Sequence, residues 1–159
     1  MRKLTVLCVG RLKEAFYIDA AAEYVKRLSR YAKTEVIEIP EVRLPERPSP
    51  AQIQAALRKE ADALQAKIPP SATTVALCIE GKALSSERFA DTLSDWSAQG
   101  DAPVFLIGGS YGLHDSIKDG ASFRLSMSPM TFPHHLARVM LLEQLYRAFQ
   151  INAGGRYHK

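Results

Sequence analysis

Three short segments in the second half of the chain combine glycine, hydroxyl and sulfur-containing side chains in a way that suits a small-molecule site. They are Leu77–Lys82 (LCIEGK), Ile107–Gly112 (IGGSYG) and Leu125–Pro133 (LSMSPMTFP). Paired glycines let a backbone approach a ligand closely. A loop rich in Met and Phe can surround an adenine whose edge is read by backbone amides and carbonyls. Each segment is equally typical of a turn or loop that binds nothing.

Standard nucleotide and hydrolase motifs are absent from these segments. The glycines of residues 107–112 have the spacing GGxxG, whereas the dinucleotide fingerprint is GxGxxG, and the chain has no Walker A loop. Ser110, His134 and Asp115 are the residue types of a hydrolase triad, but the GxSxG nucleophile elbow is missing. A hydrolase is therefore a weaker hypothesis than a binding site for a nucleoside.

The sequence predicts no metal centre. His134 and His135 are adjacent on a predicted helix, where neighbouring side chains point about 100° apart. Cys8 and Cys78 lie in apolar runs and lack the spacing of zinc ligands. We therefore expect both cysteines to pack in the core as small hydrophobic residues.

The hydrophobic pattern alternates between strands and helices, which predicts an α/β fold. The expected strands are Lys3–Gly10, Thr34–Ile39, Thr74–Ile79, Pro103–Ile107 and Ser122–Ser126. The expected helices cover about 14–31, the stretch from Ser49 to the prolines at 69–70, a segment opened by Ser85, and about 133–150. Such alternation favours a mainly parallel sheet with helices on both faces. Ligands of such sheets bind beyond the carboxyl ends of the strands, where the three segments lie.

Two of these helices carry more specific signals. Ser49, Pro50 and Gln52 have the pattern of a capping box with proline at the first helical position. On the first helix, Lys26, Arg30 and Lys33 are expected to share one face. That basic face fits either a phosphate backbone or plain solvent. Residues 1–60 hold 12 Lys and Arg against 8 Asp and Glu, so the excess positive charge lies there.

The last helix has two apolar stripes rather than one. The first comprises Ala137, Leu141, Leu145 and Ala148, and the second Val139, Leu142, Tyr146 and Phe149. One stripe is enough to cover a sheet, so the second predicts a partner subunit. Arg138, Glu143 and Arg147 would then lie at or near the subunit boundary.

Length and composition exclude several classes of protein. The chain has 159 residues, 47% of them hydrophobic and 24% charged, which is typical of one globular domain. Its apolar runs are far shorter than the ~20 residues of a membrane-spanning helix. The apolar run near the start is also too short for a signal peptide and is followed by charged residues. We expect a cytoplasmic protein without membrane contact.

Several motifs together resemble one known family. They are Phe105–Gly112 (FLIGGSYG), Leu125–His134 (LSMSPMTFPH), Leu142–Ala148 (LEQLYRA) and the closing Tyr157–Lys159, with Val9–Lys13 (VGRLK) and Glu38–Pro40 in support. This combination strongly resembles the ribosomal RNA large subunit methyltransferase H family, a branch of the SPOUT superfamily. The likeness covers the whole chain.

The resemblance implies a fold, a partner and an activity. The expected fold is a single SPOUT-type α/β domain over residues 1–159, with a carboxyl-terminal trefoil knot in a cofactor-binding part at about 73–159. The family works as a homodimer, which agrees with the doubly apolar last helix. It transfers a methyl group from S-adenosylmethionine to N3 of a pseudouridine in 23S ribosomal RNA of the assembled ribosome. No metal takes part.

The resemblance also assigns residues. It places the cofactor against Leu77, Gly108 and the loop Met127, Ser128, Pro129, Met130, Thr131 and Phe132. It places Arg147, Tyr157 and His158 near the target nucleotide, across the dimer interface. His158 is the expected general base because its pKa range is close to neutral pH. Arg147 would stabilise the ionised base or hold a phosphate.

Two other functions remain as alternatives. A non-catalytic ribosome- or RNA-binding protein would keep the same fold without turnover. A hydrolase would use Ser110 with a histidine.

Overall fold

A single five-stranded parallel sheet forms the centre of the molecule. The computed structural model describes residues 2–159. Its strands are β1 (Arg2–Val9), β2 (Ala32–Ile39), β3 (Thr74–Ala83), β4 (Val104–Ile107) and β5 (Phe123–Ser126), in the spatial order β2-β1-β4-β3-β5. Every neighbouring pair is parallel, so the α/β prediction is confirmed.

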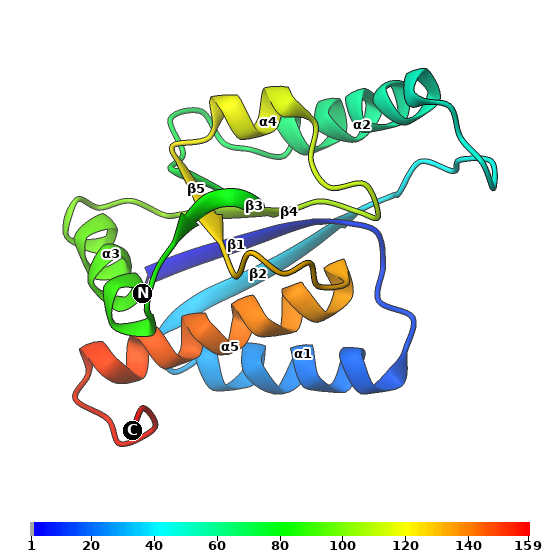
Figure 1. Ribbon diagram of the computed structural model, residues 1–159. Coiled ribbons are helices and arrows are strands. Elements are labelled where there is room, and N and C mark those ends of the chain that lie inside the picture. The colour runs from blue at the N-terminus through cyan, green and yellow to red at the C-terminus, as the bar shows by residue number, and fades with distance from the viewer. Residues whose placement is uncertain (1) are drawn as a thin grey trace.

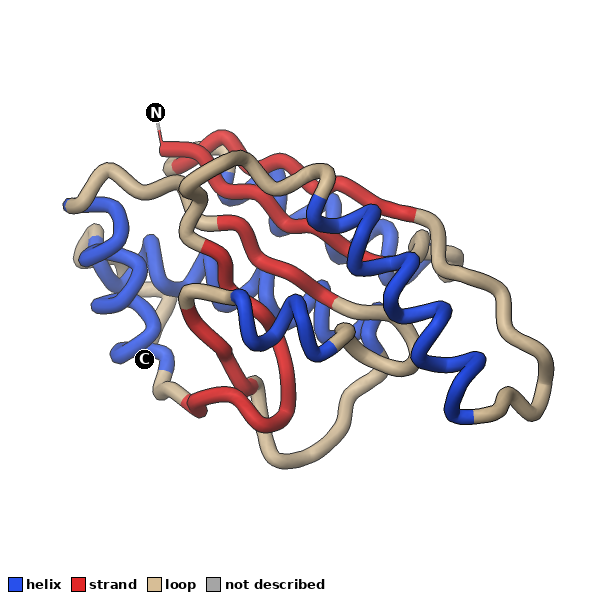
Figure 2. The backbone as a smooth tube through the Cα atoms, turned by 90° about the horizontal axis from the view of Figure 1, so that it is seen from above, coloured by secondary structure: helices blue, strands red, loops and turns tan. Residues whose placement is uncertain are grey.

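Helices cover both faces of this sheet. They are α1 (Ala15–Leu28), α2 (Pro50–Gln65), α3 (Ser86–Ala98), α4 (Asp115–Gly120) and α5 (His134–Asn152). Figure 1 shows α2 and α4 on one face and α1, α3 and α5 on the other, and Figure 2 shows α2 and α4 crossing over the strands. The sequence did not predict α4, because six residues are too few to reveal a helical period. Within residues 2–159, no helix has the length and apolar content needed to cross a bilayer.

The central strands are buried on both sides, which explains their continuous apolar sequence. Residues 4–9 of β1 and all of β4 are buried. Successive side chains of a strand point to opposite faces. Val6 and Cys8 therefore join the core under α1, α3 and α5, while Leu7 and Val9 join the core under α2 and α4.

The capping box at the start of α2 is confirmed. The Ser49 hydroxyl accepts a hydrogen bond from the Gln52 backbone N–H at 3.1 Å, and the Gln52 side-chain carbonyl accepts one from the Ser49 N–H at 2.8 Å. Both donors would otherwise be unsatisfied at the helix start. The cap therefore fixes where the proline-rich loop of residues 40–48 ends.

Half of the second apolar stripe of α5 is buried within this chain, whereas Val139 and Tyr146 are half-buried, so the stripe alone does not establish a partner subunit. Leu142 and Phe149 are 0% and 4% exposed within this single chain. The reason is that α5 lies under the sheet between α1 and α3 and is covered on several sides. The ring of Tyr31 stacks on Phe149 with 5.4 Å between the ring centroids.

The basic helix face predicted in the first half is wrong. Helix α1 ends at Leu28, and Ser29 forms its C-cap. Arg30 lies in the turn that follows, and Lys33 lies on β2. The helix stops early because the chain must enter the buried position of Ala32 at the start of β2. Lys26, Arg30 and Lys33 therefore do not line up on one helix.

Arg138 lies inside the molecule rather than at a subunit boundary, which corrects another expectation. Its side chain is 3% exposed. One guanidinium nitrogen donates to the Glu38 carboxylate at 2.6 Å and the other to the Gly10 carbonyl at 3.0 Å. Arg138 of α5 thus links the ends of β1 and β2 by hydrogen bonds, beside the site described below.

We predict that Arg138→Ala lowers the free energy of unfolding by about 2–3 kcal/mol, because two hydrogen bonds of a buried cation are lost. The free energy of unfolding is measured by urea denaturation, monitored by circular dichroism. The matched control is Arg58→Ala, since Arg58 makes an exposed helical ion pair with Asp62 that should contribute about 0.5 kcal/mol or less. Equal effects of the two substitutions would contradict the structural role of Arg138.

Candidate functional site

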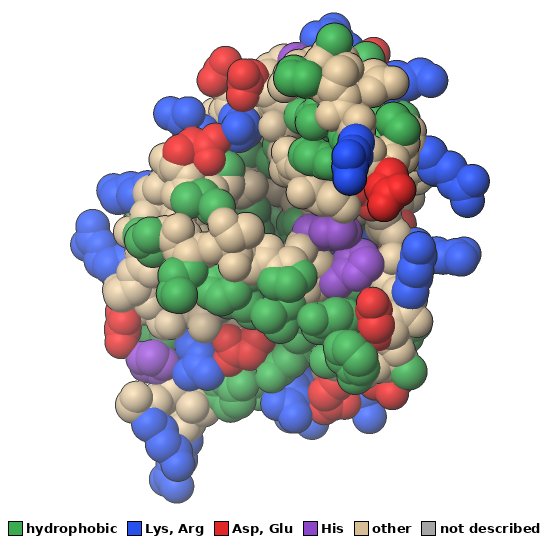
Figure 3. Space-filling view, turned by 45° about the vertical axis from the view of Figure 1, so that its right-hand side comes forward, with side chains coloured by type: hydrophobic (Ala, Val, Ile, Leu, Met, Phe, Trp, Pro, Cys, Tyr) green, Lys and Arg blue, Asp and Glu red, His purple; other side chains and the backbone are tan. Residues whose placement is uncertain are grey.

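The three segments singled out in the sequence meet around one cavity of about 780 Å³, which we call the loop cavity. Its walls come from the end of β3, the turn after β4, the loop after β5 and the first turns of α5. This volume lies within the usual range of ligand pockets, about 300–1,000 Å³. Figure 3 shows the molecule hollowed at this end, beside two histidine side chains drawn in purple.

A bulge in β3 shapes the first wall. Leu77 and Lys82 both pair with Leu125 of β5, so residues 78–81 leave the ladder. Residues 78–80 line the cavity. Gly81 makes the bulge possible, because a Cβ atom there would lie 2.8 Å from the backbone carbonyl carbons of Arg124 and Leu125. The sequence predicted that this strand ends at Ile79, and the bulge explains the difference. Gly81 follows the apolar run after Glu80, so the sequence pattern alone did not mark it as part of the strand.

A tight glycine turn forms the second wall. The Gly112 N–H donates to the Gly109 carbonyl at 3.0 Å, and Gly112 has a φ of +78°. A Cβ atom on Gly108 would overlap the backbone of Gly112. Glycine is therefore needed at position 108 for the turn itself, in addition to any close approach of a ligand.

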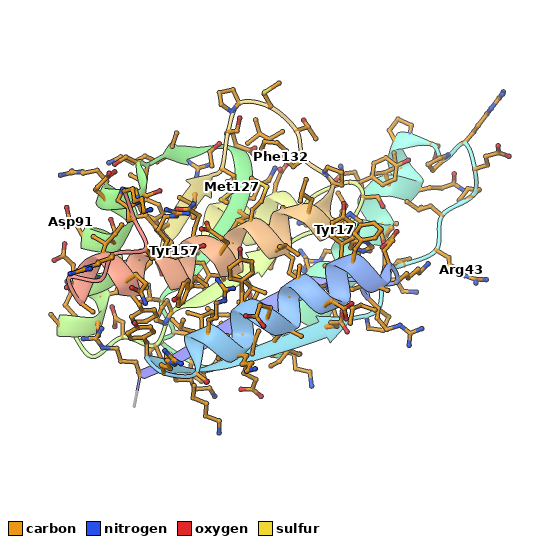
Figure 4. All side chains as sticks on the ribbon, turned by 90° about the horizontal axis from the view of Figure 1, so that it is seen from below. Tyr17, Arg43, Asp91, Met127, Phe132 and Tyr157 are labelled. Carbon is orange, nitrogen blue, oxygen red and sulfur yellow. The ribbon has the colours of Figure 1, made fainter. Side chains whose placement is uncertain are left out.

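The loop after β5 forms the third wall, and hydrogen bonds within the loop stabilise it. The Ser126 hydroxyl donates to the Ser128 carbonyl at 3.1 Å, and the Met130 N–H donates to the Ser128 hydroxyl at 3.0 Å. The residues of this loop that line the cavity are Met127, Ser128, Met130, Thr131 and Phe132, whereas Pro129 does not line it. Figure 4 labels Met127 and Phe132 at the two ends of the loop.

Glu41 stabilises the glycine turn by a hydrogen bond from another part of the chain. The sequence analysis did not predict this role. Its carboxylate accepts the Ser110 backbone N–H at 2.9 Å, across 69 residues of sequence. Burial raises the pKa of Glu41, but the hydrogen bonds from Ser110 and the nearby His134 and His135 together leave that pKa below its ordinary value. The only sequence signal was an acidic residue just beyond the carboxyl end of a strand.

His134 lines the loop cavity and is a neutral ring. Burial, and then the neighbouring His135, lower the pKa of His134. Its Nε2 atom is buried and has no hydrogen-bond partner among residues 2–159. At neutral pH the ring is therefore an uncharged part of the cavity wall.

The hydrolase triad is not assembled. Within the part of the chain that the structure describes, no hydrogen bond joins the Ser110 hydroxyl to His134. Asp115 instead lies 3.4 Å from the Lys118 ammonium group. The same residues 2–159 contain no cluster of three His, Cys, Asp or Glu side chains that could hold a metal ion.

The three residues expected near the target nucleotide, Arg147, Tyr157 and His158, lie together with two carboxylates, Glu87 and Glu143. We call these five residues the tail cluster. Arg147 donates through Nε to Glu143 at 3.0 Å, and its charged carbon lies 4.7 Å from the centre of the Tyr157 ring. The Tyr157 hydroxyl also donates to Glu143, at 3.0 Å. None of these residues lines the loop cavity. Figure 4 shows Tyr157 beside the later part of α5, away from Phe132.

The hydrogen bonds of the tail cluster fix its proton positions. A guanidinium group only donates, so the Arg147 contact at 3.1 Å requires His158 Nδ1 to accept. His158 Nε2 then carries the hydrogen that faces the Glu87 carboxylate at 2.7 Å. Burial and the Glu143 hydrogen bond raise the pKa of Tyr157 to about 12, so this phenol remains protonated at neutral pH.

The loop cavity suits an adenosyl group by its composition. Leu77, Ile107 and Phe132 supply apolar surface, and the backbone groups of the glycine turn and of the loop after β5 supply donors and acceptors at its walls. The Lys118 ammonium group on the rim is neutralised by Glu80 at 2.6 Å. A cationic sulfonium would therefore meet apolar and sulfur-containing side chains rather than an unpaired positive charge.

Comparison with known proteins places the chain in a family. A family model described as a predicted SPOUT methyltransferase matches residues 2–158. Among solved structures, a probable methylase family protein from Haemophilus influenzae superposes with a TM-score of 0.57 at 11% identity, covering 99% of this chain and 71% of that one. A protein assigned to the methylase family from Neisseria gonorrhoeae gives 0.52 at 11% identity, with 91% and 82% coverage.

A third structure is the SpoU methyltransferase AviRb from Streptomyces viridochromogenes, solved with its cofactor AdoMet. It gives a TM-score of 0.49 at 16% identity and covers 97% of this chain and 59% of that one. At such identities a superposition shows the fold alone, and this chain spans only part of each of the three proteins. The family match, in contrast, runs over nearly every residue and supports S-adenosylmethionine as the cofactor, as the sequence predicted. The three loops around one cavity thus occur in a chain that belongs to the SPOUT methyltransferase family.

Proposed function

We propose that this protein transfers a methyl group from S-adenosylmethionine to N3 of a pseudouridine in 23S ribosomal RNA, acting on the assembled ribosome in the cytoplasm. The observation that carries the proposal is the convergence of the three motif-bearing loops on one nucleoside-sized cavity. Family membership supports the reaction class. The resemblance of the motifs to the large subunit methyltransferase H family supports the substrate, and with it the expected knot at about 73–159.

The chain's own residues then have distinct tasks at the cofactor. S-adenosylmethionine supplies the methyl carbon, already attached to a good sulfonium leaving group. Leu77, Gly108 and the loop of Met127, Ser128, Met130, Thr131 and Phe132 hold it and exclude water. Pro129 belongs to the same loop but is exposed and does not line the cavity. The remaining requirement is to align N3 with the methyl group and to remove or polarise the N3 proton.

The tail cluster meets this requirement only from a second copy of the chain. Arg147, Tyr157 and His158 lie away from the loop cavity of their own protomer. In a homodimer that pairs through α5, as the resemblance implies, the tail cluster of one protomer faces the loop cavity of its partner. Next to the cluster, α5 carries Val139 and Met140 along an apolar groove of about 390 Å³ that a partner helix would cover.

Proton positions limit the roles within the cluster. Tyr157 acts as a hydrogen-bond donor, because its phenol is protonated at neutral pH. Arg147 stabilises the negative charge that develops on the base or holds a phosphate. His158 serves as the general base only after Arg147 releases Nδ1. Binding of RNA phosphate by Arg147 provides such a release.

Thr131→Trp tests the position of the cofactor. We expect it to weaken S-adenosylmethionine binding at least tenfold, or about 1.4 kcal/mol, because an indole on this exposed residue fills the loop cavity. Isothermal titration calorimetry gives the affinity. Pro129→Trp is the matched control from the same loop outside the cavity. It should bind nearly as the wild type does, and equal weakening by both variants would misplace the cofactor.

A mixing experiment tests the shared active site. His158→Ala and Thr131→Trp should each be inactive in transfer of labelled methyl groups to ribosomes from a strain lacking this gene. Coexpressed in equal amounts, they should recover about a quarter of wild-type activity, because half of randomly paired dimers are mixed and each mixed dimer has one intact site.

No recovery in mixed dimers of verified composition would place the tail cluster and the cavity of one site in the same protomer. A wild-type protein that binds ribosomes and S-adenosylmethionine but transfers no methyl group would favour the non-catalytic alternative.

A further inference from the structure

A second hollow, of about 990 Å³, adjoins the loop cavity. It is lined by the ends of β1 and β2, by residues 40–45 and by the start of α5. The two hollows share Ser110, Tyr111 and His134. A ligand lying in the second hollow would therefore be next to whatever reacts in the first.

The exposed charges of the second hollow are mainly unpaired cations. Arg11, Lys13 and Arg43 line it and are exposed. Within residues 2–159, no carboxylate lies at salt-bridge distance from any of the three.

Each carboxylate of the same hollow has a neighbouring polar group, but only Glu38 is paired with a permanent cation. Glu38 pairs with the buried Arg138 at 2.6 Å, and Glu41 accepts the Ser110 N–H at 2.9 Å. Glu14 lies 3.5 Å from His135. Arg138 compensates only Glu38, so the three cations face the two remaining carboxylates, Glu14 and Glu41, and an excess of one positive charge favours a negatively charged ligand.

Tyr111 presents an aromatic ring on the ridge between the two hollows. It is 50% exposed, although it sits on a turn held by the Gly112–Gly109 hydrogen bond and by Glu41. In the described part of the chain, no other aromatic ring stacks on it. A tyrosine on a rigid turn loses little conformational entropy when it binds. Such a ring can stack on a planar group of a ligand.

We propose that Tyr111 is a stacking platform for a base of single-stranded RNA whose phosphates pass along Arg11, Lys13 and Arg43 in the second hollow. The combination of a planar ring with a row of cations is the pattern by which proteins bind single-stranded nucleic acid. The inference deepens the proposed function, because it brings an RNA strand to the rim of the loop cavity, and it rests on that function for the identity of the reacting nucleotide.

Direct binding tests this platform without any methyl transfer. The probe is a fluorescently labelled single-stranded oligouridylate, and anisotropy gives its affinity for the full chain. A stacked base contributes about 1–3 kcal/mol, so Tyr111→Ala should weaken binding about 5- to 150-fold, whereas Tyr111→Phe should stay within about twofold of wild type. Phe16→Ala is the matched control, because Phe16 is an exposed ring that lines neither hollow. It should bind as the wild type does.

A second readout reports stacking itself. The natural chain has one tryptophan, Trp96, so Tyr111→Trp adds one reporter over a constant background. Oligouridylate should quench the added fluorescence, whereas inorganic polyphosphate, which has no bases, should compete for the cations without quenching. Unchanged affinity in Tyr111→Ala, no quenching in Tyr111→Trp, or no wild-type binding at low salt would each overturn the proposal.

The outcome is separable from that of the proposed function. Normal methylation of ribosomes by wild type with no dependence of RNA affinity on Tyr111 rejects the platform alone. Tyr111-dependent binding of oligouridylate by a protein that methylates no ribosomal RNA supports the platform and rejects the proposed reaction.

Discussion

The order of three neighbouring parallel strands is the constraint on which the site depends. Strands β4, β3 and β5 lie side by side in the sheet and run in the same direction. Their carboxyl ends therefore meet at one edge, and the loops that follow them must be neighbours although they are far apart in the sequence. The loop cavity is the space between the loops that follow β4 and β5 and the bulge within β3. Three features then set its shape: the β3 bulge at Gly81, the turn at Gly109–Gly112, and the hydrogen bond from the Ser110 N–H to the Glu41 carboxylate.

Most strands and long helices could be predicted from the sequence, because burial on both faces of a sheet and on one face of a helix leaves a regular apolar pattern. The α2 cap was predictable because Ser49 and Gln52 satisfy each other locally. The β3 bulge was not, since it depends on how closely Gly81 approaches β5. Glu41 was missed because its partner, Ser110, is 69 residues away.

The corrected expectations about α5 share a physical cause. An apolar pattern predicts that a helix face is buried, but it does not say whether the same chain or a partner subunit buries it. Leu142 and Phe149 of the second α5 stripe are covered by other parts of the same chain, and Tyr31, in the turn after α1, stacks on Phe149. Arg138 was expected at a subunit boundary because the second stripe predicted a partner there, yet it is buried in this chain, where Glu38 and the Gly10 carbonyl accept its hydrogen bonds. The proposed homodimer therefore rests on the resemblance, on the separation of the tail cluster from the loop cavity, and on the half-buried groove at Val139 and Met140 rather than on the whole second stripe.

A crystal structure of the protein with S-adenosylmethionine tests the central claim most directly. The account predicts the adenosyl group in the loop cavity, in contact with Leu77, with the glycine turn and with the loop from Met127 to Phe132. It also predicts the tail cluster of a second protomer at the mouth of that cavity. Cofactor bound in the second hollow, or bound in the loop cavity with both tail clusters remote from it, would contradict the account.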